Sequence, residues 1–142
     1  MSDKRKPCAQ CPFSRRTEPG LTGGTCPTVY VGQSIGPFWL PCHMDPKYKA
    51  NRLDTDALQC AGAAIFRANI GVTELLPEQL LRLEADTQRV FANFEELIAH
   101  HMRIPLPMAR MVLMITPPMM LLEQQLERQT NKTLDSTQFR QG

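Results

Sequence analysis

The hydrophobic pattern separates an irregular first part of the chain from a helical second part. Up to about residue 40, apolar residues are scattered among prolines and glycines, which interrupt helices and form turns. Residues 28–31 are the stretch in this part that suggests a short strand. The first forty residues are therefore expected to be mostly irregular.

Helical patterns begin near residue 54. Capping residues at 54–56 and the glycine Gly71 predict a first helix between them, with Cys60 in its first turns. Apolar residues then recur at helical spacing over 73–101, which predicts one helix or two joined near Asp86.

Prolines divide the rest of the chain. After Pro105 and Pro107 comes a short apolar run at 108–115, and a last helix is expected from about 118 to 128. The polar tail at 130–142 is expected to be frayed.

Length and composition fit one ordinary domain. The chain has 142 residues, of which 42% are apolar and 21% charged, so wholesale disorder and fibrous architectures are disfavoured. No apolar run reaches the ~18 residues that a membrane-spanning helix needs, and the first ten residues lack the apolar segment of a signal peptide. We therefore expect a cytoplasmic protein, in the host cytoplasm if it is phage-encoded, without a membrane partner.

The net charge of +2 conceals a difference between the two parts. Residues 1–72 hold nine Lys/Arg against five Asp/Glu, whereas residues 73–142 hold seven against nine. Such a basic patch can offset the negative charge of thiolates, contact the phosphates of nucleic acid, or be a solvated terminus. The basic residues near the first cysteines are Lys4, Arg5, Lys6, Arg15 and Arg16.

Four cysteines form the strongest chemical pattern. Cys8 and Cys11 make a C-x2-C pair, and Cys42 and Cys60 supply two more sulfurs. Both thiols of the pair lie on one tight loop, so they can reach the same ion or cluster at little ordering cost. Because cytosolic thiols stay reduced, the pattern favours metal ligation or redox chemistry over disulfides. We predict a metal centre on these four cysteines.

Three kinds of centre fit this spacing. A 4Fe–4S cluster is the first, since it needs four thiolates and tolerates wide spacing, and Cys11 is followed by a proline as in many cluster sites. A structural Zn²⁺ on the same cysteines is the second, with His43 or Cys26 as a replacement ligand. A redox dithiol at Cys8 and Cys11 is the third, although the chain before it is too short for the usual strand.

Several neighbouring residues have expected roles. Cys26 is expected to be a small buried side chain outside the site, and His43 to hydrogen-bond a ligand sulfur or the backbone. Cys60 should gain from the helix N-terminus, which lowers a thiol pKa. His100 and His101 end a predicted helix and diverge by about 100°, so they are poor ligands for one ion.

Methionines are concentrated in the second half of the chain. Methionine is an adaptable gap filler, so packing in the core is the first interpretation and a protein-binding face the second. The six residues are Met102, Met108, Met111, Met114, Met119 and Met120.

Motifs of the common enzymes do not occur. The chain has no phosphate-binding Gly-rich loop with a lysine, no dinucleotide fingerprint, no nucleophile elbow and no HExxH. Its carboxylates are scattered at solvating positions of helical faces. The sequence therefore favours a protein that is not an enzyme.

Three short motifs together resemble a known family. CxxCPF at 8–13, PCH at 41–43 and CAG at 60–62 are similar to a small cysteine-rich family of unknown function in bacteriophages and bacterial genomes. The resemblance covers about residues 7–66 and implies a metal-binding core without an activity. Its signature positions would be Cys8, Cys11, Cys42, His43 and Cys60. A more distant likeness is to iron–sulfur transcription regulators of actinobacteria.

Together these observations predict a mainly α fold. An irregular, metal-stapled N-terminal half (1–72) should pack on a small helical bundle (73–142) within one domain. We expect a non-enzymatic accessory or regulatory protein, phage-derived, that binds a protein partner through its Met-rich helical half. The alternatives are a nucleic-acid-associated regulator that uses the basic N-terminal face, and a redox or electron-transfer protein.

Overall fold

The computed structural model describes residues 11–22, 25–36, 40 and 59–127, and this part of the protein is mainly α-helical, as predicted. Within it no strand forms, and an isolated antiparallel bridge joins Ser14 to Val90. The helices are α1 (Pro27–Ile35), α3 (Ala61–Asn69), α4 (Phe94–Met102), α5 (Leu106–Ile115) and a helix at Pro118–Glu127, with a 3₁₀ turn at Thr73–Leu75.

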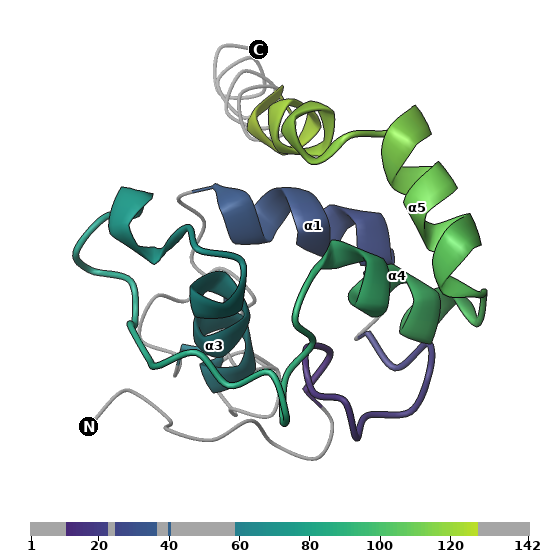
Figure 1. Ribbon diagram of the computed structural model, residues 1–142. Helices are drawn as coiled ribbons and strands as arrows, with labels where there is room; N and C mark the ends of the chain where they lie inside the picture. Colours follow the sequence, from purple (N-terminus) through teal and green to yellow (C-terminus); the bar gives the residue numbers. More distant parts are fainter. Residues whose placement is uncertain (1–10, 23–24, 37–39, 41–58, 128–142) are drawn as a thin grey trace, which may run out of the picture.

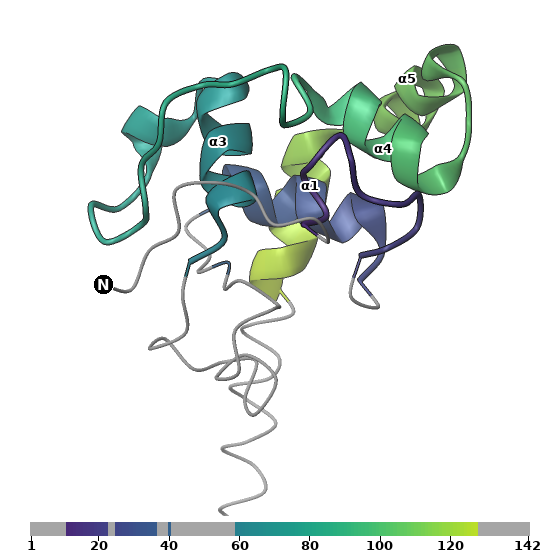
Figure 2. The same ribbon diagram turned by 90° about the horizontal axis from the view of Figure 1, so that it is seen from below.

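Helix α1 lies at the centre of the molecule, with α3 and α4 against it and α5 packed on α4 (Figures 1 and 2). The helix Pro118–Glu127 passes over α1 at Gly32. A Cβ atom at this position would lie 2.5 Å from the carbonyl oxygen of Leu121. Only glycine allows the two backbones to approach so closely.

The core combines side chains from the first and second parts of the chain. Phe13 of the N-terminal loop is buried together with Val31 of α1, Phe66 of α3 and Leu97 of α4. The ring of Phe13 lies 5.3 Å from the rings of both Tyr30 and Phe66. The loop that carries Cys11 is therefore anchored in the same core as the helices.

The prediction of a strand at 28–31 is wrong, because these residues belong to α1. Tertiary contacts explain the difference. Val31 is fully buried, the Tyr30 hydroxyl donates to the carbonyl of Thr22, and the Ser34 hydroxyl donates to carbonyls of the preceding turn. Such packing outweighs the modest strand preference of β-branched residues. The expectation that residues 1–40 are mostly irregular is also wrong over this segment.

The helix that carries the CAG motif begins later than predicted. Residues 54–56 lie outside the described residues, but Gln59 and Cys60 are not helical and α3 starts at Ala61. The predicted end is confirmed, since Gly71 adopts the left-handed conformation with φ of 78°.

The prediction of one helix, or two joined near Asp86, over 73–101 is wrong for most of this range, and only its last part is α-helical, as α4. The structure has a 3₁₀ turn at Thr73–Leu75 and no further helix until α4. Side chains hold the intervening backbone instead: the Arg82 guanidinium donates to five carbonyls, and the Asn69 amide bonds to both sides of the turn at Asp86. The backbone groups are thus satisfied without a helix.

The predicted last helix is confirmed at Pro118–Glu127, and the apolar run at 108–115 is part of α5. The tail at 130–142 lies outside the described residues. No single described helix is long and apolar enough to span a membrane, although α5 and the last helix pass this test as a pair bent by 54°.

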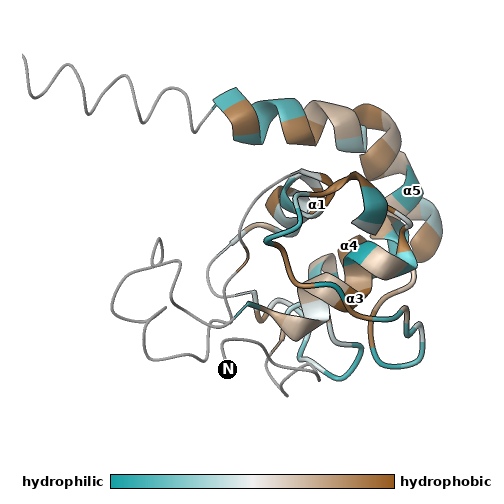
Figure 3. Cartoon of the chain, turned by 90° about the vertical axis from the view of Figure 1, so that its left-hand side faces the viewer, coloured by the Kyte–Doolittle hydropathy of each residue, from teal (hydrophilic) through white to brown (hydrophobic). Residues whose placement is uncertain are grey.

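Core packing is the wrong explanation for the methionines. All six between Met102 and Met120 are exposed, by 42% to 79%. In Figure 3, brown apolar positions occupy the bend between α5 and the last helix. This half of the molecule therefore presents an apolar outer surface.

Candidate metal centre

Cys11 and Cys60, which are 49 residues apart in the sequence, meet in the core. Their sulfur atoms lie 3.5 Å apart without a disulfide bond, and both residues are buried. The structure thus brings together the second cysteine of the C-x2-C motif and the cysteine of the CAG motif.

Cys60 is held by the beginning of α3. It occupies the N-cap position, where its sulfur accepts a hydrogen bond from the Ala63 N–H at 3.4 Å. Its own N–H donates to the carbonyl of Leu40 at 2.8 Å. A thiolate at this position satisfies N–H groups that the helix itself leaves unpaired.

Two histidines of α4 hold the loop that carries Cys11. The Nε2–H of His101 donates to the carbonyl of Pro12 at 2.6 Å, and its Nδ1 accepts from the Gly20 N–H at 3.1 Å. The Nε2–H of His100 donates to the carbonyl of Thr17 at 2.6 Å. These bonds fix the loop immediately after Cys11 to the last turn of α4.

The surroundings of Cys60 favour its thiolate form. The hydrogen bond from the Cys11 thiol lowers the pKa of Cys60, and this effect outweighs burial, which raises it. The N–H groups at the start of α3 and the charge of Arg67 lower the pKa further. A lowered pKa prepares a cysteine to bind a metal ion, because the thiolate is the ligand.

The positive charge of Arg67 is buried between α3 and the end of α1. Its guanidinium donates to the carbonyls of Gln33, Ser34 and Gly36. Burial lowers the pKa of Arg67 to about 10, and the charge of Cys60 opposes this effect. Arg67 therefore stays protonated at neutral pH and both caps α1 and supports the thiolate.

The other predicted ligands are placed differently. Cys8, Cys42 and His43 lie outside the described residues. Cys26 is exposed, with its sulfur 3.2 Å from the Thr28 hydroxyl, so the expectation that it is buried is wrong. In the described ranges, no group of three or more His, Cys, Asp or Glu side chains is arranged to hold a metal ion. The described part of the site is the Cys11–Cys60 pair.

The basic residues near the site have different surroundings. Lys4, Arg5 and Lys6 lie outside the described residues, and Arg16 is exposed. Arg15 forms a two-pronged ion pair with Glu96, at 2.7 and 3.0 Å, and also donates to the backbone carbonyl of Thr87. Burial raises the pKa of Glu96, but hydrogen bonds from Arg15 and the Ala92 N–H outweigh it and hold that pKa below its usual value. Arg15 therefore links the N-terminal loop to α4.

Sequence reasoning missed the supporting residues. It placed His100 and His101 correctly at the end of a helix but gave them no contact with the cysteine loop, and it gave Arg67 no role. A histidine pair in a last helical turn is consistent with many surroundings. Only the tertiary fold shows which carbonyls these side chains reach.

Comparisons with known proteins add no assignment. No protein-family model matches the chain, and no curated protein or solved structure matches it either. The resemblance of its cysteine motifs to a phage family therefore stays a prediction, and the site is interpreted from its own geometry.

Proposed function

We propose that this protein is a non-enzymatic metal-centre protein in which one centre links the N-terminal loop to the start of α3. Cys11 and Cys60 are two of the ligands, and Cys8 and Cys42 supply the others. The observation that carries the proposal is the 3.5 Å separation of two buried sulfurs from distant parts of the chain. Two sulfurs from distant parts of the chain that meet beside a helix N-terminus are placed as two ligands of one metal ion would be.

The sulfur separation supports zinc more than a cluster. With Zn–S bonds of about 2.3 Å and tetrahedral angles, two thiolates on one zinc ion lie about 3.8 Å apart. In a 4Fe–4S cluster each cysteine binds a different iron, so the sulfurs are farther apart. We therefore propose a structural Zn²⁺ and keep the 4Fe–4S cluster as the alternative.

The residues around the pair suit a structural centre. Phe13 and Phe66 help to fill the core that contains both sulfurs, and Cys60 is largely shielded from water. Arg67 offsets part of the negative charge that thiolates bring into this core. A link between residues 11 and 60 would order a segment that has few apolar side chains of its own.

The second part of the proposal is that the protein acts by binding a protein partner. We call the exposed side chains of Met108, Met111, Met114, Ile115 and Met119 the methionine face; their exposed fractions run from 51% to 79%. Apolar surfaces of this kind mark interaction sites, and methionine adapts to the shape of a partner.

Anaerobic purification followed by an absorption spectrum and iron, sulfide and zinc analysis tests the metal centre. We expect a colourless protein with about one zinc per chain. A broad band near 400 nm with about four irons per chain would establish the cluster instead. Protein without any bound metal would contradict the proposal.

A further inference from the structure

Helix α5 is apolar on its outer side as well as its inner side. It contacts the body through Ala109 and Leu113, which are buried, whereas Met111, Met114 and Ile115 are exposed by 59%, 79% and 74%. A helix that is hydrophobic all round is normally buried. The described residues of one copy therefore leave the outer side of α5 uncovered.

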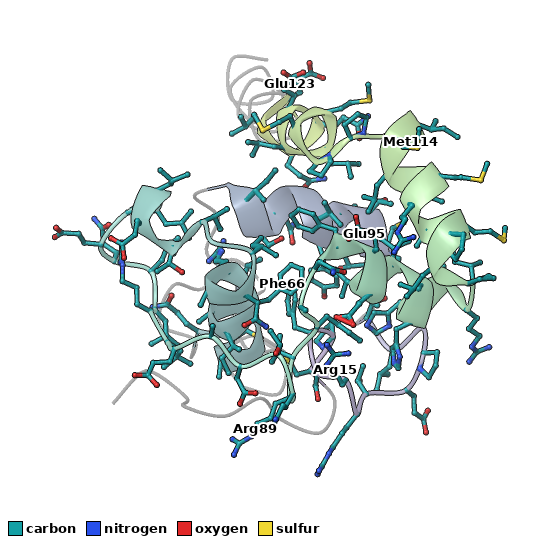
Figure 4. All side chains as sticks on the ribbon, viewed as in Figure 1. Arg15, Phe66, Arg89, Glu95, Met114 and Glu123 are labelled. Carbon is teal, nitrogen blue, oxygen red and sulfur yellow. The ribbon has the colours of Figure 1, made fainter. Side chains whose placement is uncertain are left out.

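The apolar surface continues across a bend. Helix α5 and the helix Pro118–Glu127 are bent by 54° relative to each other and form the two arms of a wide V, and both arms carry exposed methionines. Met114 projects away from the rest of the molecule (Figure 4). The V is thus a two-armed surface with its apolar centre near the bend.

The two arms carry opposite charge. In α5 the charged residue is Arg110, and Arg103 lies just before the helix, whereas the other arm carries Glu123 and Glu127. All four side chains are exposed, and none forms an ion pair within the described part of the chain. Arg103 also donates a hydrogen bond to the Pro19 carbonyl of the N-terminal loop at 3.2 Å, so Arg110 is the basic residue that belongs to the α5 arm itself.

We propose that a second copy of this chain covers the methionine face, in a twofold-symmetric dimer. A twofold axis parallel to the bisector of the V, and displaced to its outer side, lays α5 of each copy across the helix Pro118–Glu127 of the other. In such an interface each contact occurs twice, so a patch must complement itself. The basic arm then meets the acidic arm on both sides, around a centre of methionines. This inference rests on the proposal that the face binds protein, and it names that protein.

Other occupants suit the face less well. An anionic membrane would attract Arg103 and Arg110, but it would repel Glu123 and Glu127 on the other arm. An apolar helix of uniform charge would likewise match one arm only. Opposite charge on the two arms of one apolar surface favours a partner with the same two arms.

The mass of the full metal-loaded chain in solution, measured by light scattering on a sizing column, tests this inference. We expect about twice the chain mass of 16.1 kDa. Met114→Glu should weaken association about thirtyfold or more, because it places a charge at the centre of the interface. Leu75→Glu is the matched control: Leu75 is 83% exposed in the 3₁₀ turn, away from α5, and its variant should remain dimeric.

A charge exchange makes the test specific for a second copy. Arg110→Glu alone and Glu123→Arg alone should each weaken the dimer, since like charges then face each other. The double variant Arg110→Glu/Glu123→Arg should restore it, because the two arms again carry opposite charge. Helical circular dichroism of each variant verifies that it is folded.

Three results would overturn the inference. These are a monomeric wild-type chain at high protein concentration, a dimer that Met114→Glu leaves intact, and a monomer that sediments with vesicles of anionic phospholipid. Metal content, measured on the same samples, keeps this inference separate from the metal centre. A zinc-loaded monomer would contradict the dimer alone, whereas a metal-free dimer would contradict the metal centre alone.

Discussion

At the scale of single residues, His101 links the cysteine loop to α4. Its Nδ1 accepts from Gly20 while its Nε2–H donates to Pro12, which directly follows Cys11. Both bonds require the neutral ring with its proton on Nε2. His101 therefore positions the loop without being a ligand itself.

This arrangement predicts a loss of stability in mild acid. Burial lowers the pKa of His101, the bond to Pro12 raises it, and neighbouring His100 lowers it, so the folded-state pKa lies below its ordinary value. The unfolded chain then binds the proton more readily. The contribution of His101 to stability is complete above the unfolded pKa of about 6.5 and is lost as the pH falls through the folded-state pKa.

Denaturant unfolding at several pH values measures this effect. We expect His101→Ala to lower the free energy of unfolding by about 1–3 kcal/mol at neutral pH, because it leaves the Pro12 carbonyl and Gly20 N–H without partners. The variant should also show a weaker loss of stability in acid than the wild type. If the free energy of unfolding falls equally steeply with decreasing pH in the wild type and in His101→Ala, His101 is not the source of the acid sensitivity.

At the scale of elements, the contact between α1 and the last helix depends on Gly32. The atoms nearest to an added Cβ are the carbonyl oxygen and carbon of Leu121, at 2.5 and 2.7 Å. These are backbone atoms, so the whole helix would have to shift. This contact also positions the helix Pro118–Glu127, which carries Glu123 and Glu127.

We predict that Gly32→Ala destabilises the protein by about 1–3 kcal/mol. Alanine is the better helix former by about 1 kcal/mol, so a loss of stability isolates the clash with Leu121. Relative to the wild type, Gly32→Ala should speed up amide hydrogen exchange more in the helix Pro118–Glu127 than in α3. Gln33→Ala, at the next position of α1, serves as the control and should leave that exchange unchanged. A fully stable Gly32→Ala variant would mean that the two helices do not approach so closely.

The elements also show how far the sequence predicts this fold. The mainly α class, the end of α3 at Gly71 and the last helix follow from capping residues and spacing. The segment after Leu75 misled the prediction, because its leucines recur at helical spacing while Arg82 and Asn69 occupy the backbone groups that a helix would pair. Periodicity records where apolar side chains occur, but not which polar side chains compete for the backbone.

For the candidate site, thiol chemistry was the useful signal. Cysteine spacing predicted one metal centre on Cys8, Cys11, Cys42 and Cys60; the structure places the sulfurs of Cys11 and Cys60 3.5 Å apart, and the other two cysteines lie outside the described residues. Spacing could not reveal the anchors His101 and Arg67, since their partners are backbone carbonyls that only the fold brings near. It also could not decide whether the methionines face the core or the solvent.

At the scale of the whole molecule, the two proposed tasks lie in two separate places. The cysteine pair would hold the N-terminal loop on the helical body, and the methionine face would join this body to a second copy. Loop residues such as Phe13 also enter the common core, so loss of the centre should destabilise the whole described domain and not the loop alone.

The most direct test of the central claim is the metal content of Cys60→Ser beside that of Cys26→Ser. Both variants remove one thiol, but the first removes a buried sulfur next to Cys11 and the second an exposed one. We predict that Cys60→Ser loses its metal and unfolds at a markedly lower temperature, while Cys26→Ser keeps about one zinc per chain and its stability. If Cys60→Ser retained the metal, or if Cys26→Ser lost it, the assignment of the centre to Cys11 and Cys60 would be wrong.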